Sequence, residues 1–243
     1  MTMHVVSHKP FELPNALGYQ PIYVGETMAS DTHHDSSYAN NIADKNAYYC
    51  ELTALYALWK HTNEDVVGIS HYRRYFVIKE YRGIFKYLLK DKAYPQEVWR
   101  QQFAKGYDLI LPRPMKLGSS VAAHYRKHHD LADLMLVREV LQDTDVSSVF
   151  YFDQAMASGE YHGLNMLIAP KSIFDCYCSW LFPILFTLEQ RLDMASRTLY
   201  QQRVFGFVSE RLIDVWLLKE TKLKYLEVPT ITLDEKPFVR GIQ

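Results

Sequence analysis

The sequence predicts a single α/β domain, and three observations support this. Short runs rich in β-branched residues alternate with longer segments of helical periodicity, which is the pattern of strands and helices packed in layers. The 243 residues, 48% of them hydrophobic, suffice for a substantial core. No linker, internal repeat or low-complexity tract divides the chain, so one domain over residues 1–243 is the simplest prediction. The helix-rich second half favours a small mixed sheet with an added helical layer.

Composition excludes several classes of protein. A net charge of −1 gives no support to nucleic-acid binding through bulk charge. The three cysteines lack metal-ligand spacing and are expected to be reduced thiols in a cytoplasmic protein. No apolar stretch approaches the ~20 residues that span a bilayer, and no signal-peptide pattern is present. We expect a cytoplasmic protein, whose apolar or basic faces would still allow peripheral association with the inner face of the membrane.

The first quarter of the chain predicts two strands and two ligand loops. Met3–Val6 is expected to be a strand, and the loop that follows, Ser7–Pro10, is a candidate ligand loop. Ile22–Gly25 is the second predicted strand. Glu26–Ala43 is rich in Ser, Thr, Asp, Asn and His, which indicates a functional loop.

A helix is predicted from Asp44, as its N-cap, through Lys60, because apolar residues recur there at helical spacing. Lys45 and Asn46 then lie in the first turn, beside backbone N–H groups that favour an anion. Phosphate or sugar-hydroxyl contact is one interpretation of this pair, and a solvated helix start is the other.

The central strand is predicted at Val66–Ile69, where an apolar, β-branched run opens into a polar cluster. His71 to Arg74 follow at its carboxyl end, the place where open α/β sheets bind their ligands. Two adjacent arginines at this end indicate an anion, unless both pair with carboxylates of the fold.

Further helices are expected at 82–90 and 96–104, and a further strand at 107–111. A helix is also predicted over 119–141, and its start carries three histidines in six residues. His124 and His128 share a face, but no H-E-x-x-H pattern is present and neighbouring charges are positive. A solvated or substrate-lining helix start is therefore favoured over a metal site.

The last third predicts a strand at 163–169, interrupted by Asn165, whose amide requires partners if buried. Helices follow at 173–192, bent or split at Pro183, and at 201–219, before a closing strand at 224–228. The chain contains no G-x-G-x-x-G, P-loop, G-x-S-x-G or paired C-x-x-C pattern, which disfavours the commonest dinucleotide, NTPase, hydrolase and zinc classes.

Two segments, Asp44–Ala54 and His71–Phe76, resemble a bacterial capsular and exopolysaccharide synthesis family long known only as a domain of unknown function. Residues 163–166, 180–185 and 203–212 are similar to that family in the same order, so the resemblance spans nearly the whole chain. Its members are regarded as glycosyltransferases. The resemblance implies a single Rossmann-like domain of the glycosyltransferase A type, which transfers a sugar from a nucleotide-sugar donor, expected to be UDP-linked, to a glycan or lipid-linked glycan.

In that fold class the donor lies over the strand ends. We expect it to be held by Ser7, His8, Lys9, Lys45, Asn46, His71, Tyr72, Arg73 and Arg74. Most such folds place an Asp-x-Asp element and a divalent metal at the central strand, but this strand ends in His71-Tyr72-Arg73-Arg74. Two guanidiniums can neutralise a diphosphate directly, so no metal is expected to be required. Manganese bound through Asp153 or the 31–35 loop is the alternative.

For the chemistry, an inverting transfer needs a group that takes the acceptor hydroxyl's proton. Glu210 is the leading candidate base, with Asp153 and His162 in reserve; Asn165 and Arg203 are expected to contact sugar. An internal ion pair of Glu210 with Arg203 or Arg211 is the structural alternative. A non-catalytic glycan-binding or scaffold protein is the competing function, and a nucleotide-sugar hydrolase is a weaker third.

Overall fold

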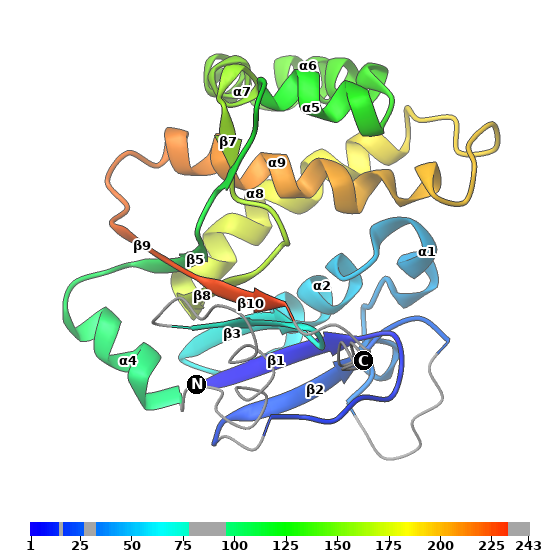
Figure 1. Ribbon diagram of the computed structural model, residues 1–243. Helices are drawn as coiled ribbons and strands as arrows, with labels where there is room; N and C mark the ends of the chain where they lie inside the picture. Colours follow the sequence, from blue (N-terminus) through cyan, green and yellow to red (C-terminus); the bar gives the residue numbers. More distant parts are fainter. Residues whose placement is uncertain (15–16, 27–32, 78–95, 233–243) are drawn as a thin grey trace, which may run out of the picture.

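The computed structural model describes residues 1–14, 17–26, 33–77 and 96–232 (Figure 1). Its centre is a mixed eight-stranded sheet. The strands are β1 (Thr2–Ser7), β2 (Tyr19–Tyr23), β3 (Val66–His71), β4 (Arg74–Phe76), β5 (Leu109–Pro112), β8 (Leu167–Pro170), β9 (Tyr225–Val228) and β10 (Thr230–Thr232). The predicted α/β class is confirmed, as is the mixed character of the sheet.

Strand β1 runs parallel to β2 on one side and to β3 on the other. β8 is antiparallel to both of its neighbours, β3 and β5, and β9 is parallel to β5. β4 and β10 form an antiparallel extension beyond the end of β3. A short ribbon of β6 (Met115–Lys116) and β7 (Glu160–Tyr161) lies outside this sheet.

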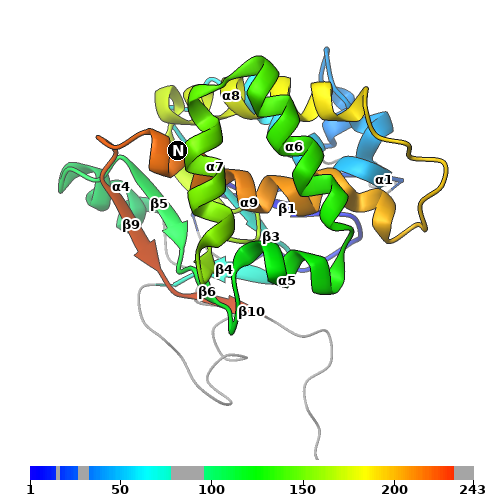
Figure 2. The ribbon, with the colours of Figure 1, turned by 90° about the horizontal axis from the view of Figure 1, so that it is seen from above.

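Helices cover both faces of the sheet. They are α1 (Asn46–Tyr49), α2 (Leu52–His61), α4 (Gln96–Ala104), α5 (Val121–His128), α6 (Leu131–Thr144), α7 (Ser147–Ala157), α8 (Lys171–Glu189) and α9 (Val204–Lys219). Figures 1 and 2 show α5, α6 and α7 as an outer layer over α8 and α9.

Alternate strand residues build two cores because successive side chains of a strand point to opposite faces. Val6 packs with the large helical layer, whereas its neighbour Val5 packs with α4 and its buried Trp99. In β8, Ile168 packs in the core on the α4 side, whereas its two neighbours, Leu167 and Ala169, pack with the large helical layer. Both faces of the sheet are therefore buried, and polar chemistry is confined to strand ends.

Two predicted helices are interrupted in the structure. The helix over 44–60 breaks at Cys50, which has a positive φ of 53°; a 3₁₀ turn at Ala43–Lys45 leads into α1, so Asp44 is no N-cap. The helix over 119–141 is two helices, and Asp130 caps the second by accepting from the Ala132 amide at 2.9 Å.

The strand over 163–169 is shorter than predicted because Leu164 and Asn165 have positive φ values, 78° and 48°, which extended backbone excludes. It begins only at Leu167. Pro183 lies inside α8 without splitting it, and the second strand is 19–23 rather than 22–25. The predicted helix at 82–90 lies outside the described residues. Within the described residues, no helix combines the length and the apolar character needed to cross a bilayer.

Candidate active site

The site lies where three strand ends meet at one edge of the sheet. Val6, near the end of β1, pairs with His71 at the end of β3. Because β8 is antiparallel to β3, it enters the sheet at this same edge, with Leu167 opposite Ile69. The loop after β1, the turn after β3 and the loop before β8 are thereby brought together.

Two adjacent cavities open at this edge. The strand-end cavity, of about 380 Å³, is lined by residues of β1 and its loop, Asn46 and the turn after β3. The central cavity, of about 470 Å³, lies between that turn and the helices α5 and α9. The residues that line both are His8, Cys50, Glu51, His71, Tyr72 and Arg203.

Tyr72 is the point on which the first ligand loop and the β3 turn converge. Its ring has His8 edge-on at 5.4 Å, the Lys9 ammonium at 5.2 Å and the Arg73 guanidinium at 4.9 Å. The expected approach of Ser7–Lys9 to Arg73 is therefore present. Arg73 and Arg74 line the central cavity, and Ser7 lines the strand-end cavity.

Of the helix-start pair, only one residue reaches the site. Asn46 lines the strand-end cavity and donates to the Cys50 carbonyl at 2.8 Å. Lys45 instead pairs with Glu189 of α8 at 2.7 Å and lines neither cavity. The structure therefore places Lys45 outside both cavities, because a carboxylate on a distant helix pairs with it.

Glu51 is the residue that the sequence-based reasoning missed. It follows Cys50, where the helix is interrupted, and it lines both cavities. One oxygen of its carboxylate accepts a hydrogen bond from Asn165 Nδ2 at 2.7 Å. The sequence signal that could have identified Glu51 is its position as an acidic residue inside an aromatic, apolar segment. The prediction of one continuous helix concealed it, because the break was not foreseen.

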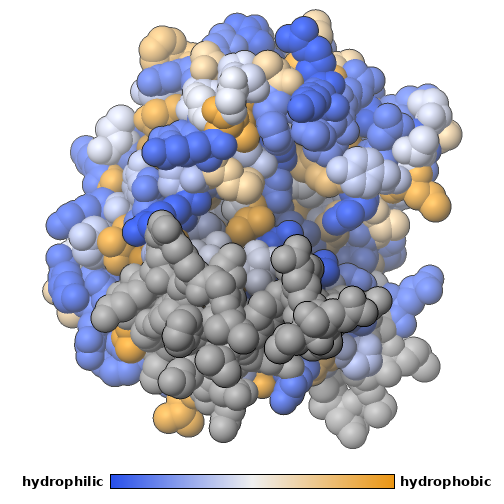
Figure 3. Space-filling view, in the orientation of Figure 1, coloured by the Kyte–Doolittle hydropathy of each residue, from blue (hydrophilic) through white to orange (hydrophobic). Residues whose placement is uncertain are grey.

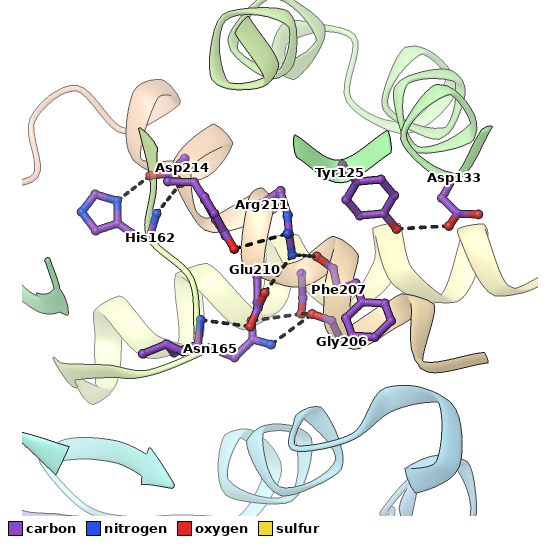
Figure 4. Close-up of polar contacts among 12 residues, drawn as sticks. Tyr125, Asp133, His162, Asn165, Gly206, Phe207, Glu210, Arg211 and Asp214 are labelled. Atoms are coloured by element: carbon purple, nitrogen blue, oxygen red, sulfur yellow. Dashed lines mark hydrogen bonds and ion pairs between the residues drawn. The ribbon is translucent and has the colours of Figure 1, made fainter. Parts of the chain in front are cut away.

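Glu210 lies deeper in the central cavity, fixed by two donors (Figure 4). Its oxygens accept from the Leu164 amide at 3.1 Å and from the Arg211 guanidinium at 2.8 Å. Burial raises the pKa of Glu210, Arg211 opposes that shift, and the charge of Glu51 adds to it. The alternative expected for Glu210, an internal ion pair, is present with Arg211. Glu210 nevertheless lines the central cavity, where it can contact a substrate.

Arg211 is itself buried, at 3% exposure, and donates to the Phe207 carbonyl at 2.7 Å. Arg203 is on the surface side, where its Nε donates to Cys50 Sγ at 3.2 Å and its side chain lines both cavities. Burial raises the pKa of the Cys50 thiol to about 11, so this sulfur is a neutral acceptor at neutral pH.

The loop His162–Met166, hereafter the 162–166 loop, links the two glutamates. Asn165 donates to Glu51 and to the Gly206 carbonyl, at 2.7 and 3.2 Å, and accepts from the Ser209 hydroxyl at 3.0 Å. Both N–H donors and the oxygen of this half-buried amide are thus directed to the site and to α9. In the same loop, the Leu164 carbonyl accepts from His71 Nε2 at 2.5 Å, and burial lowers the pKa of His71, which favours the neutral imidazole.

The two reserve bases do not reach either cavity. Asp153 lies on the exposed surface of α7, paired with Arg138 at 2.7 Å. His162 lies between Asp214 and Glu227, at 2.5 and 3.1 Å, and lines a separate cavity of about 240 Å³. Asp153 is held by a residue of the preceding helix, and His162 by residues 52 and 65 positions along the chain, none of which the local sequence revealed.

The balance of charge in the central cavity favours anions. The described residues that line it include four arginines, Arg73, Arg74, Arg203 and Arg211, against the two carboxylates of Glu51 and Glu210. In the part of the chain that the structure describes, no group of three His, Cys, Asp or Glu side chains is arranged to hold a metal ion. His124 and His128 are neighbours with ring centroids 4.8 Å apart, and both line the cavity.

Comparison with known proteins places this site in context. A family model described as a domain of unknown function, DUF4422, matches residues 2–221. No curated protein matches the chain. The chain is similar to a solved apo structure of WbbM, described as a bifunctional glycosyltransferase, with a TM-score of 0.85 and 25% sequence identity. This similarity covers 100% of the present chain and 47% of the WbbM chain, so the present chain spans about half the length of that protein.

Proposed function

We propose that this chain, which belongs to the DUF4422 family, is a glycosyltransferase that moves a sugar from a nucleotide-sugar donor to a glycan acceptor. The observation that carries the proposal is the meeting of two cavities at one carboxylate, Glu51, beside an arginine-rich strand end. A transferase needs two substrates on either side of a proton acceptor. The similarity to a bifunctional glycosyltransferase over the whole of this chain supports this reaction class.

The donor's place in this proposal is the strand-end cavity, with its diphosphate toward the β3 turn. Ligands of open α/β sheets bind at the carboxyl ends of strands, and Ser7, His8 and Asn46 line that region. Arg73 and Arg74 offer forked donors suited to phosphate oxygens, so the leaving diphosphate can be stabilised by guanidiniums. We propose a UDP-linked donor and a capsular, exopolysaccharide or O-antigen glycan as the product, as the family resemblance implies. We also propose that no metal is required, because the guanidiniums of Arg73 and Arg74 can supply the positive charge.

Glu51 is the base that the geometry favours. In an inverting transfer, the acceptor hydroxyl oxygen attacks the anomeric carbon, the bond from that carbon to the diphosphate oxygen breaks, and the hydroxyl proton passes to a carboxylate. Glu51 borders both cavities, and among the described residues its carboxylate accepts one hydrogen bond, from Asn165. Both oxygens of Glu210 already accept hydrogen bonds, from the Leu164 amide and Arg211, so Glu210 is better suited to orienting the acceptor.

The test compares Glu51→Gln and Glu51→Ala with the matching changes at Glu210. We expect Glu51→Gln to lower transfer by about 10²–10⁴-fold, the usual contribution of a general base. UDP should still raise the melting temperature of the variant, because a ligand of the native state stabilises it by RT ln(1 + [L]/Kd). Added formate should partly restore transfer in Glu51→Ala by supplying a carboxylate.

Two outcomes would change the proposal. Formate rescue confined to Glu210→Ala would return the role of base to Glu210. A wild-type protein that shows no stabilisation by UDP, GDP or CDP and no transfer, yet binds glycan, would favour the scaffold function instead.

A further inference from the structure

We propose that Tyr200, Phe207 and His129, hereafter the aromatic shelf, form the subsite that holds a sugar ring of the acceptor glycan. This inference rests on the proposed function and adds to it the place and chemistry of acceptor recognition. The shelf borders the central cavity on the side of α5 and α9, away from the β1 and β2 strand ends.

The three rings of the shelf pack on one another. The His129 and Phe207 rings are stacked with centroids 4.1 Å apart, and the Tyr200 ring lies 5.1 Å from Phe207 and 5.9 Å from His129. His129 and Phe207 are half-buried, whereas Tyr200 is 53% exposed. The outermost ring therefore presents aromatic surface to the cavity and to solvent.

The apolar side chains at positions 199 and 200 are exposed and do not contribute to the hydrophobic core. Tyr200 lines a polar cavity, and its neighbour in sequence, Leu199, is 84% exposed, so two successive large apolar side chains are open to solvent here. Large apolar residues exposed at a cavity are typical of a binding surface. Aromatic faces bind sugars because the C–H groups of a pyranose ring pack against the electron-rich ring face.

Polar groups around the shelf complete a sugar-binding environment. Arg203 lies with its guanidinium 5.5 Å from the Phe207 ring, and Glu51, Glu210 and His128 line the same cavity, so both donors and acceptors surround the aromatic surface. Burial and the charge of Arg211 lower the pKa of His129 to about 4, which leaves a neutral ring in the shelf at neutral pH. A neutral shelf suits an uncharged sugar ring better than an isolated anion.

The position of the shelf assigns it to the acceptor. The strand-end cavity, where we place the donor, is not lined by any of the three shelf residues. The carboxylate of Glu51 lies between that cavity and the central one. A sugar on the shelf would thus approach Glu51 from the side opposite the donor, as a transfer reaction requires.

The experiment measures glycan binding separately from transfer. Wild-type protein, Tyr200→Ala and Tyr200→Phe are titrated by ligand-observed NMR with methyl glycosides of galactose, glucose, mannose, rhamnose and N-acetylglucosamine, and separately with UDP. We expect Tyr200→Ala to weaken binding of the recognised glycoside at least tenfold, while Tyr200→Phe retains it and UDP affinity stays within twofold in both variants. Phe150→Ala, which removes an aromatic side chain that is 70% exposed on α7, is the matched control and should change neither affinity.

Three results would overturn the assignment. These are unchanged glycoside binding in Tyr200→Ala, loss of UDP binding in that variant with glycoside binding intact, and a wild-type protein that binds UDP but none of the glycosides. Failure of the proposed transferase function can be told apart from failure of the subsite. A protein that binds both the glycoside and UDP but transfers no sugar would lose the enzymatic role and keep the subsite.

Discussion

At the scale of single residues, Tyr72 organises the cationic part of the site. Its ring is flanked by the Lys9 ammonium and the Arg73 guanidinium, at 5.2 and 4.9 Å. Cation–π contacts of this kind hold flexible cationic side chains in place before a ligand arrives. An aromatic residue therefore helps to preorganise the diphosphate site that we propose.

We expect transfer to persist in excess EDTA and to collapse in Arg73→Ala. The physical reason is that a departing diphosphate needs positive charge, which the guanidiniums at the β3 turn are placed to supply. Initial rates with EDTA and with manganese, for the wild type and for Arg73→Ala, test this. Arg138→Ala, on the far surface, is the control that should leave the rate unchanged. Activity that disappears with chelation and returns with manganese would contradict metal independence.

At the scale of elements, the 162–166 loop decides the geometry of the site. Its amide at Leu164 binds Glu210, its Asn165 side chain binds Glu51, and both positions have the positive φ that turns the chain before β8. At its start the loop is anchored to α9, where the His162 ring and its amide both bind Asp214, at 2.5 and 2.9 Å (Figure 4). The anchor lies outside both cavities and acts on the site through the loop.

Because of the contact between His162 and Asp214, we expect the free energy of unfolding to fall as pH rises. Burial alone would lower the pKa of His162, but the hydrogen bond and charge of Asp214 and the charge of Glu227 outweigh it and raise that pKa. Because the folded-state pKa is the higher one, the stabilisation is fully present below the unfolded value, about 6.5, and is lost as pH rises through the raised folded value. Tyr225, whose ring is edge-on at 5.9 Å, is a further titratable group that faces the imidazole.

We therefore expect His162→Gln to lower the free energy of unfolding by about 1–3 kcal/mol near pH 6 and by less near pH 8.5. Urea denaturation at both pH values measures the difference. His61→Gln, a change at a half-buried histidine at the end of α2, should show no comparable pH dependence. Equal destabilisation by His162→Gln at both pH values would mean that the imidazolium does not contribute.

At the scale of the whole molecule, two cores on opposite faces of the sheet leave polar chemistry to the edge. The smaller core depends on α4, whose Trp99 is fully buried and packs edge-on against Phe76 of β4 with centroids 6.0 Å apart. β4 begins at Arg74, so this core also supports the turn that carries the arginines. On the face shown in Figure 3, outside the grey atoms, hydrophilic residues predominate and apolar ones lie scattered among them.

Truncation of the Trp99 side chain should lower the free energy of unfolding substantially. We expect Trp99→Ala to destabilise the protein by about 3–5 kcal/mol, the usual cost of removing a buried aromatic side chain. Phe150→Ala, at a side chain that is 70% exposed, should change stability by less than about 0.5 kcal/mol. Chemical denaturation of both variants provides the comparison, and similar values for the two would mean that α4 contributes little to the folded core.

The sequence by itself determined the α/β class, the positions of β1, β3, β5 and β9 to within about two residues, and the polar cluster at His71–Arg74. These features are local, because β-branched runs favour strands and parallel strands place their carboxyl ends at one edge. The convergence of the Ser7–Lys9 loop with Arg73 followed from the same rule.

Only the tertiary structure decided which carboxylates and which cations line the cavities. Glu51 meets Asn165 across a separation of 114 residues, and Lys45 is drawn to Glu189 across 144. Asp153 pairs with an arginine of the neighbouring helix, and His162 is held by carboxylates on α9 and β9. Local spacing carries no information about such partners, because the free energy that selects them comes from packing of α8, α9 and the sheet, which forms only in the folded chain.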